Sequence, residues 1–389
     1  MRKLILGLSL GAMLIFGASD MLRGVAAPYL QHDLHINYLQ LGYLFSSNSL
    51  GYLIGSLVAG FAMERLGMRF VQAFGILVTV AGFTLVAFSG GLVSLFMGYI
   101  LAGLGGGWLE IAVNGIVPAM ETSDHGQARL FNWLHGFYGI GAFVFPVLAA
   151  WLIQHTSGWR SVYLMVAIVL LLGLVVVAIA NYKVLNSTSA RKHDPIPLRQ
   201  LFSHPVLYGL LIAIVAYVMA EVGLATWLPT YLVKVHDFSL ARGSVYLSGF
   251  YLTFTLGRLT AHWWVHRVGS ERAVLMSSFA SIVFVVVTLA GGSKGLFAVF
   301  FAGAGFAIIF PTIAAVASRS FADHAGKVLG LLFSAAAIGS LTANSLIGLM
   351  ATAYGLSVGM SVIVAFMALV FVSMIFVVWV QRRAVTAPE

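Results

Sequence analysis

The sequence predicts an all-α membrane protein in which twelve transmembrane helices form two six-helix bundles. Hydrophobic residues make up 60% of the 389 residues and charged residues only 8%, which leaves too little polar surface to cover a water-soluble globule of this length. The apolar residues lie in runs long enough to cross a bilayer, and one long polar segment separates the first six runs from the last six.

The predicted spans follow one another with short polar connections. They are residues 4–29, 39–63, 70–89, 92–120, 131–153, 161–180, 206–231, 243–265, 274–290, 295–317, 328–350 and 356–380. The polar segment 181–205 is expected to be a cytoplasmic connection between an N-terminal bundle, residues 1–180, and a C-terminal bundle, residues 206–389.

The distribution of basic residues predicts the orientation in the membrane. If the N-terminus is cytoplasmic, the inner segments carry most of the 21 Lys and Arg residues, and the outer connections carry only Arg160, Lys234, Arg242 and Lys294. Lys and Arg are enriched in cytoplasmic loops. We therefore expect a multi-pass protein of the plasma or inner membrane with both termini in the cytoplasm. The net charge of +9 does not indicate nucleic-acid binding, because the basic residues are spread singly rather than gathered in one patch.

A weak internal repeat supports the division into halves. The segment GFAMERLGMR at 60–69 follows the second span, and GRLTAHWWVHRVGSER at 257–272 follows the eighth. The pair resembles the signature turn of the major facilitator superfamily, with Glu64 in place of the usual Asp. This resemblance implies two bundles that rock about a binding site near the middle of the bilayer.

Three acidic residues lie inside predicted spans: Asp20 in the first, Glu110 in the fourth and Glu221 in the seventh. In a fold of four three-helix repeats, these spans are the leading helices that line a central cavity. Ionisable groups at membrane depth are costly and usually mark a path for substrate or protons. The three carboxylates are therefore the first candidates for a functional site.

Glu110 stands in the segment GLGGGWLEIAVNGIVPAM, residues 103–120, and is the only charge of its span. Asn114 lies four residues on and shares its helix face, and Trp108 is an interior aromatic candidate. The glycines before Glu110 allow a neighbouring helix or a ligand to approach the backbone closely. A structural carboxylate paired with a basic residue of another helix is the alternative interpretation.

The first span places Arg23 one turn after Asp20. The two charges either neutralise each other or form a coupling device, in which a proton or substrate releases the carboxylate from its Arg. In the fifth span, the candidates are Asn132, His135 and Tyr138. His135 and Tyr138 share a face, and His135 is either a proton relay or a structural, hydrogen-bonded His.

The seventh span reads AYVMAEVGLATWLPTYL, with Tyr217 one turn before Glu221. Trp227 is either a stacking platform for a sugar ring or a member of the interfacial aromatic belt. In the eighth span, Arg258 is interpreted as part of the repeated turn or as an anchor that reaches the interface.

Four segments together resemble the fucose/galactose/glucose:proton symporters, and within them the bacterial glucose/mannose:proton symporters. These segments are GLGGGWLEIAVN, LHGFYGIGAFVFPVL, AEVGLATWLPTYL and GFYLTFTLGRL. The resemblance implies that Glu110 and Asp20 take part in proton coupling and in binding sugar hydroxyls, and that Glu221 binds the sugar.

The sequence thus predicts a secondary active transporter that imports a monosaccharide, a hexose or deoxyhexose, with a proton. The expected binding residues are Glu110, Asn114, Asn132, His135, Tyr138, Glu221, Trp108 and Trp227. A proton-driven exporter of drugs or other amphipathic small molecules is the alternative. No enzymatic activity, cofactor, metal site or nucleic-acid partner is expected, and the protein is predicted to be a monomer in the lipid bilayer.

Overall fold

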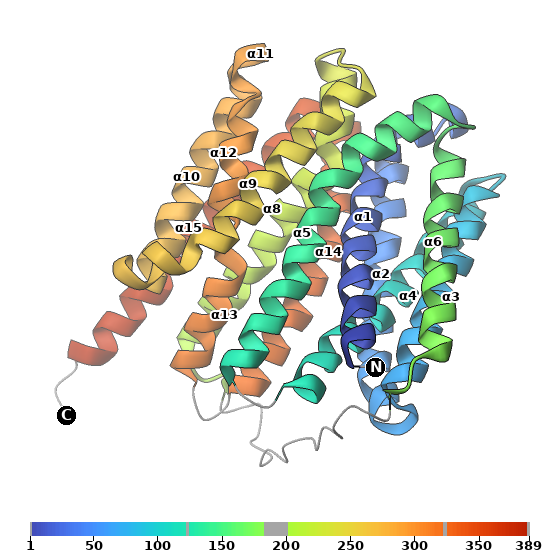
Figure 1. Ribbon diagram of the computed structural model, residues 1–389. Coiled ribbons are helices and arrows are strands. Elements are labelled where there is room, and N and C mark those ends of the chain that lie inside the picture. Colours follow the sequence, from blue (N-terminus) through green and yellow to red (C-terminus); the bar gives the residue numbers. More distant parts are fainter. Residues whose placement is uncertain (1, 122–123, 183–200, 322–324, 387–389) are drawn as a thin grey trace.

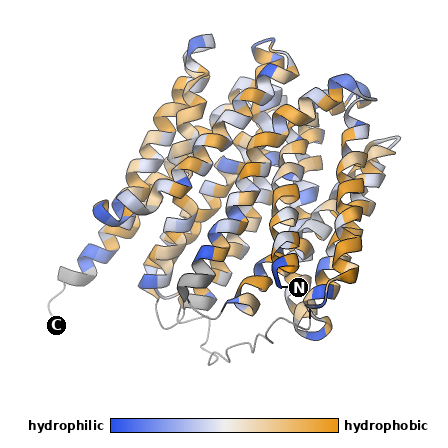
Figure 2. Ribbon diagram, viewed as in Figure 1, coloured by the Kyte–Doolittle hydropathy of each residue, from blue (hydrophilic) through white to orange (hydrophobic). Residues whose placement is uncertain are grey.

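The computed structural model describes residues 2–121, 124–182, 201–321 and 325–386, which form long helices running side by side (Figure 1). Most of the predicted connection 181–205 lies outside these residues. Helix α1 begins and helix α15 ends at the same end of the bundle, which we call the terminal end; the other is the far end. Hydrophobic residues cover most of the helices, and hydrophilic residues gather toward the two ends (Figure 2).

The N-terminal half contains the first six helices. They are α1 (Arg2–Leu34), α2 (Tyr38–Leu66), α3 (Met68–Ala87), α4 (Leu92–Met120), α5 (Asp124–His155) and α6 (Trp159–Ile179). Asn37 begins α2 by a reciprocal capping box: its side chain accepts from the Gln40 amide N–H, and the Gln40 side chain accepts from the Asn37 N–H.

The C-terminal half repeats this arrangement with one change. Its helices are α8 (Pro205–Val235), α9 (Leu240–Val268), α10 (Ser270–Ala290), α11 (Gly292–Gly295), α12 (Ala298–Phe306), α13 (Ile309–Ser320), α14 (Ala325–Tyr354) and α15 (Leu356–Thr386). The predicted tenth span is thus divided among α11, α12 and α13. Pro311 has no N–H to donate to the carbonyl of Ala307, four residues earlier, and the helix is interrupted between Phe306 and Ile309.

The predicted twelve-span architecture is confirmed in the described part of the chain. By length and composition, eleven segments are suited to crossing a membrane, counting α11–α13 as one. The twelfth is α9, which has 29 residues but carries several polar and basic side chains, among them Arg258 and Arg267.

The predicted repeat corresponds to two equivalent turns. Gly67 alone separates α2 from α3, and Gly269 alone separates α9 from α10. Their φ angles are 80° and 92°, a region that favours glycine because side chains with a Cβ rarely adopt it. The Glu64 side chain, in the first copy, lies outside the described atoms.

The glycines of α4 bring its neighbours into backbone contact. A Cβ at Gly103 would overlap the Asn48 carbonyl oxygen of α2, and one at Gly105 would overlap the Thr79 backbone of α3. Gly107 meets α2 one turn beyond Gly103. The prediction that these glycines admit a neighbouring helix is therefore confirmed, and they fix α4 between α2 and α3.

The two halves meet closely at the far end. Ser46 and Ser49 of α2 share hydrogen bonds of 2.7 and 2.9 Å with Ser345 and Ser340 of α14. Each of these two hydrogen bonds joins a side chain of the N-terminal half to one of the C-terminal half. Gly24 of α1 packs on the α8 backbone at the same end. The far end is consequently closed by direct contact between α1, α2, α8 and α14.

Candidate functional site

Asp20 is the centre of a polar cluster that joins α1, α2 and α5. Its Oδ1 lies 2.6 Å from Arg23 Nη2, and the Tyr138 hydroxyl donates to its Oδ2 over 2.9 Å. Arg23 Nη1 donates to Asn48 Oδ1 over 2.8 Å. The Asp20–Arg23 pair inferred from the helical spacing therefore forms. The Asp20 side chain is only 25% exposed and the Arg23 side chain only 13% exposed, so the pair is protected from solvent screening.

Glu110 is held by hydroxyl and amide donors. The Tyr52 hydroxyl of α2 donates to its Oε2 over 2.5 Å, and the Asn114 side chain hydrogen-bonds to it from one turn further along α4. None of the salt bridges among the described residues involves Glu110. The charge that influences it most is another carboxylate, Asp20. This arrangement does not support the alternative in which Glu110 is a structural ion-pair partner.

Glu221 lies beside the interruption between α12 and α13. Tyr217, one turn earlier in α8, lies within electrostatic reach of Glu221, and its hydroxyl donates to the Phe306 carbonyl over 3.0 Å. The positive charge of Arg258 of α9 acts on Glu221, and the Arg258 Nε donates to the Ala307 carbonyl over 3.1 Å. Arg258 is thus directed toward the interior, where it binds the Ala307 carbonyl that the helix interruption leaves free. The prediction that Arg258 belongs to the repeated turn or reaches the membrane interface is therefore wrong.

The Asp20 cluster lies within electrostatic reach of both other carboxylates. The Asp20 carboxylate acts on both Glu110 and Glu221, and Tyr251 of α9 is influenced by Asp20 and Glu221. The carboxylates predicted from three leading helices therefore belong to one polar region, with Asp20 as the member that influences the other two. Such a region can bind a proton and can form several hydrogen bonds to hydroxyl groups.

The two remaining polar candidates of α5 lie nearer the terminal end. Asn132 and His135 are exposed, and His135 lies within electrostatic reach of Arg258. Tyr138, one turn further along, is the residue of α5 that reaches the Asp20 carboxylate. Tyr138 therefore belongs to the polar cluster, while Asn132 and His135 lie at its approach from the terminal end.

The two predicted Trp candidates are buried in packing contacts. Trp108 faces α3, with its ring 4.4 Å from that of Phe74. Trp227 is fully buried, and its indole N–H donates to Asn344 Oδ1 of α14 over 3.1 Å. Its ring also packs against Phe45 of α2. Trp227 is therefore part of the contact between the halves and is not in the interfacial belt.

Sequence reasoning missed Asn48 and Tyr52, which contact Arg23 and Glu110. A signal was available: the two residues are four apart in the second predicted span and so share one helix face. No cluster of three or more His, Cys, Asp or Glu residues that could hold a metal ion occurs within the described ranges.

Long apolar helices in two halves, with ionisable side chains between them, define a polytopic membrane transporter rather than an enzyme. The sequence profile of the Major Facilitator Superfamily matches residues 8–340. The chain belongs to this superfamily.

The chain is also similar to individual proteins over most of its length. The Protein TsgA homolog of Buchnera aphidicola subsp. Baizongia pistaciae is 19% identical over 358 residues, 87% of this chain and 86% of the relative.

Among solved structures, an inward-facing bacterial homologue of the human lysosomal transporter Spinster has a TM-score of 0.83 at 12% identity. The match covers 100% of this chain and 99% of the Spinster homologue. The D-xylose-proton symporter has a TM-score of 0.79 at 14% identity, and the match covers 96% of this chain and 97% of the symporter. The transporter FucP in the outward conformation has a TM-score of 0.66 at 18% identity, and the match covers 96% of this chain and 98% of FucP. These similarities establish the fold, and the fucose/galactose/glucose branch remains a prediction.

Proposed function

We propose that the protein imports a neutral monosaccharide, a hexose or deoxyhexose, together with a proton, by alternating access. We also propose that the terminal end faces the cytoplasm, as the basic residues of the sequence indicate. Because both halves of one chain supply the polar groups, we expect a monomer to be the transporting unit.

The observation that carries this proposal is the environment of Glu110. An ionised carboxylate can accept hydrogen bonds from both the Tyr52 hydroxyl, 2.5 Å away, and the Asn114 amide. It has no cation partner among the described residues, and Asp20 is the neighbouring charge. Protonation of Glu110 would remove this repulsion and would provide one O–H donor. Glu110 is therefore suited to take up a proton, and the O–H group formed in this way could donate a hydrogen bond to a bound ligand.

Asp20 and Arg23 are suited to the next step of coupling. Asp20 already accepts from Arg23 and from Tyr138, so a sugar hydroxyl that binds there must compete with or join these donors. A change in this cluster acts on α2 through Asn48 and on α5 through Tyr138. In this way, ligand binding on α1 would alter the contacts between neighbouring helices.

The polar groups of the region match a sugar better than a lipophilic cation. Carboxylates, Asn114 and tyrosine hydroxyls offer both acceptors and donors to hydroxyl groups. Arg23 and Arg258 add positive charge beside the carboxylates, which would disfavour a cationic substrate. Glu221 supplies a carboxylate from the C-terminal half, so the ligand could contact both halves. The similarity to the D-xylose-proton symporter supports the same class of substrate.

Transport by purified protein in proteoliposomes tests the proposal. Radiolabelled hexoses, deoxyhexoses, pentoses and nucleosides are offered with an inward proton gradient, with no gradient, and with a sodium gradient at equal pH. We expect a hexose or deoxyhexose to accumulate only with the proton gradient and a protonophore to abolish its accumulation. Failure of every sugar, together with gradient-driven export of lipophilic cations, would instead support the exporter alternative.

A further inference from the structure

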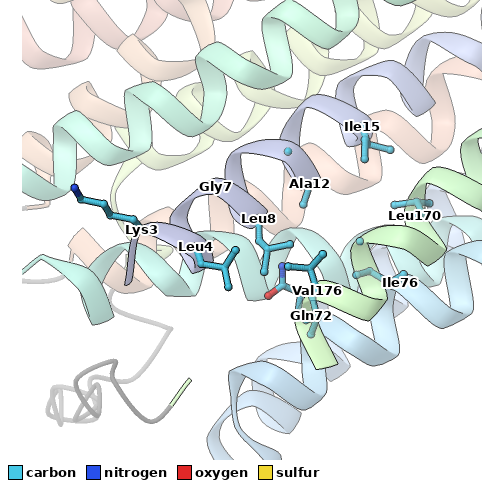
Figure 3. A pocket seen from close by; sticks show the side chains of 13 residues that line it. Lys3, Leu4, Gly7, Leu8, Ala12, Ile15, Gln72, Ile76, Leu170 and Val176 are labelled. Atoms are coloured by element: carbon cyan, nitrogen blue, oxygen red, sulfur yellow. The ribbon is translucent and has the colours of Figure 1, made fainter. Parts of the chain in front are cut away.

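A groove on the N-terminal half lies apart from the three carboxylates. It is formed by α1, α3 and α6 and has a volume of about 370 Å³. Figure 3 shows Lys3 and Leu4 at one end of the groove and Ile15 and Leu170 toward the other. Except for Lys3 and Gln72, the lining side chains are apolar or absent.

The dimensions of the groove match one leaflet of a membrane. From Lys3 to Ile15, α1 advances by twelve residues, or about 18 Å at 1.5 Å per residue. Half of the hydrocarbon core of a bilayer is about 15 Å thick. Apolar residues of α6 beside the groove are strongly exposed: Leu172 by 64% and Val175 by 59%. The groove therefore borders a surface suited to lipid tails.

Three glycines keep the groove open. A Cβ at Gly7, Gly11 or Gly173 would meet no atom within 4 Å, although all three residues line the groove. By contrast, Gly17 of the same α1 is in close contact with the α5 backbone, and a Cβ there would overlap the Tyr138 carbonyl. Close helix packing therefore accounts for a glycine at position 17, but it does not account for the glycines at the three groove positions.

A buried, unpaired polar group lies in the groove wall. Gln72 is only 1% exposed, and its Oε1 accepts a hydrogen bond from the Tyr182 hydroxyl. Burial raises the pKa of Tyr182 to about 12, so this hydroxyl remains a donor at physiological pH and orients the amide. The Gln72 Nε2 group has no partner. A water molecule needs two to four polar partners, and the side chains around Nε2, such as Leu8 and Val176, are apolar (Figure 3).

We propose that this groove binds an anionic diacyl phospholipid, with an acyl chain along α1, an ester carbonyl accepting from Gln72 Nε2, and the phosphate near Lys3. Among the described residues, the Lys3 ammonium has no ion pair. Arg69, which lies near Tyr182, adds positive charge at the same end. Anionic headgroups attract such basic residues at a membrane surface. If the terminal end is cytoplasmic, the lipid belongs to the cytoplasmic leaflet.

Lipid binding by the purified full-length protein tests this proposal independently of transport. Native mass spectrometry in detergent would compare phosphatidylglycerol with phosphatidylcholine of the same chains. We expect preferential binding of phosphatidylglycerol by the wild type. Lys3→Gln should weaken that binding about tenfold, as expected for loss of one charge-assisted contact, and should leave phosphatidylcholine binding unchanged.

Groove-filling variants provide the second test. Gly11→Leu and Gly173→Leu should each remove the phosphatidylglycerol-dependent rise in apparent Tm. Gly330→Leu is the matched control, because Gly330 of α14 also faces open space but lies outside the groove. This variant should respond to phosphatidylglycerol as the wild type does. Two substitutions in different helices guard against misfolding of either one.

Three results would overturn the proposal. Equal binding of the two lipids would indicate nonspecific annular lipid. Undiminished phosphatidylglycerol binding by a folded Gly11→Leu or Gly173→Leu variant would place the lipid elsewhere. Displacement of the lipid by glycerol phosphate alone, without acyl chains, would indicate an anion site that does not use the groove.

Discussion

Replacing Glu110 by Gln tests whether this residue carries the coupling proton. Gln keeps the shape of the protonated side chain and cannot release a proton. The Tyr52 bond of 2.5 Å would change from a charge-assisted to a neutral hydrogen bond, a loss of about 1 kcal/mol. Relief of the repulsion from Asp20 offsets part of this loss. We therefore expect the apparent Tm to fall by no more than about 2 °C.

The transport assay separates accumulation from exchange. We expect Glu110→Gln to lose accumulation driven by a pH gradient, to retain counterflow of the same sugar, and to show counterflow that no longer depends on pH. Glu271→Gln is the matched control. It removes an exposed ion pair of 3.1 Å with Arg319, worth about 0–1 kcal/mol, and should leave accumulation intact.

Two results would refute this reasoning. Accumulation at the wild-type level by a stable Glu110→Gln protein would exclude Glu110 as the coupling group and would direct attention to Asp20. A loss of stability of about 3–5 kcal/mol would indicate that a buried cation had lost its partner, as in the structural alternative.

Three further perturbations probe the fold and the orientation. Gly103→Ala should lower stability by about 2–3 kcal/mol because its Cβ overlaps the α2 backbone, whereas Gly136→Ala, in open space, should not destabilise; equal melting temperatures would contradict the close packing. Trp227→Phe leaves both polar atoms of the buried Asn344 side chain unpaired and should lower the free energy of unfolding by about 1–3 kcal/mol. A melting temperature equal to that of the wild type would count against this role of Trp227. Finally, a cysteine replacing Ser187, in a chain with no cysteine, should resist impermeant thiol reagents in intact cells; rapid labelling would reverse the proposed topology.

Much of the fold was predictable because the membrane constrains sequences strongly. Apolar length alone located the spans, and the fourth was predicted at 92–120, the bounds that α4 has. The same constraint made Asp20, Glu110 and Glu221 conspicuous, since charges are rare within apolar spans. Helical spacing then correctly joined Asp20 to Arg23 and Glu110 to Asn114.

The partners supplied by other helices were not predictable in this way. Tyr52 reaches Glu110 across 58 positions of sequence, and Trp227 meets Asn344 across 117. Tyr, Asn and Trp are common enough in apolar spans that their presence alone does not indicate a role. Arg258 was misjudged because its inward direction depends on a free carbonyl at Ala307, which arises only where the tenth span is interrupted. Such roles follow from tertiary packing rather than from local pattern.

The serine pairs at the far end have a consequence for the energetics of a transport cycle. When Ser46 and Ser49 separate from Ser345 and Ser340, water can replace each lost hydrogen bond almost fully. A seal made of buried ion pairs would instead resist opening, because each separated charge would need a new partner. The hydroxyl pairs therefore add little to the free-energy difference between the closed and open arrangements. A bound sugar or proton with only a modest preference for one arrangement could then reverse which of them predominates.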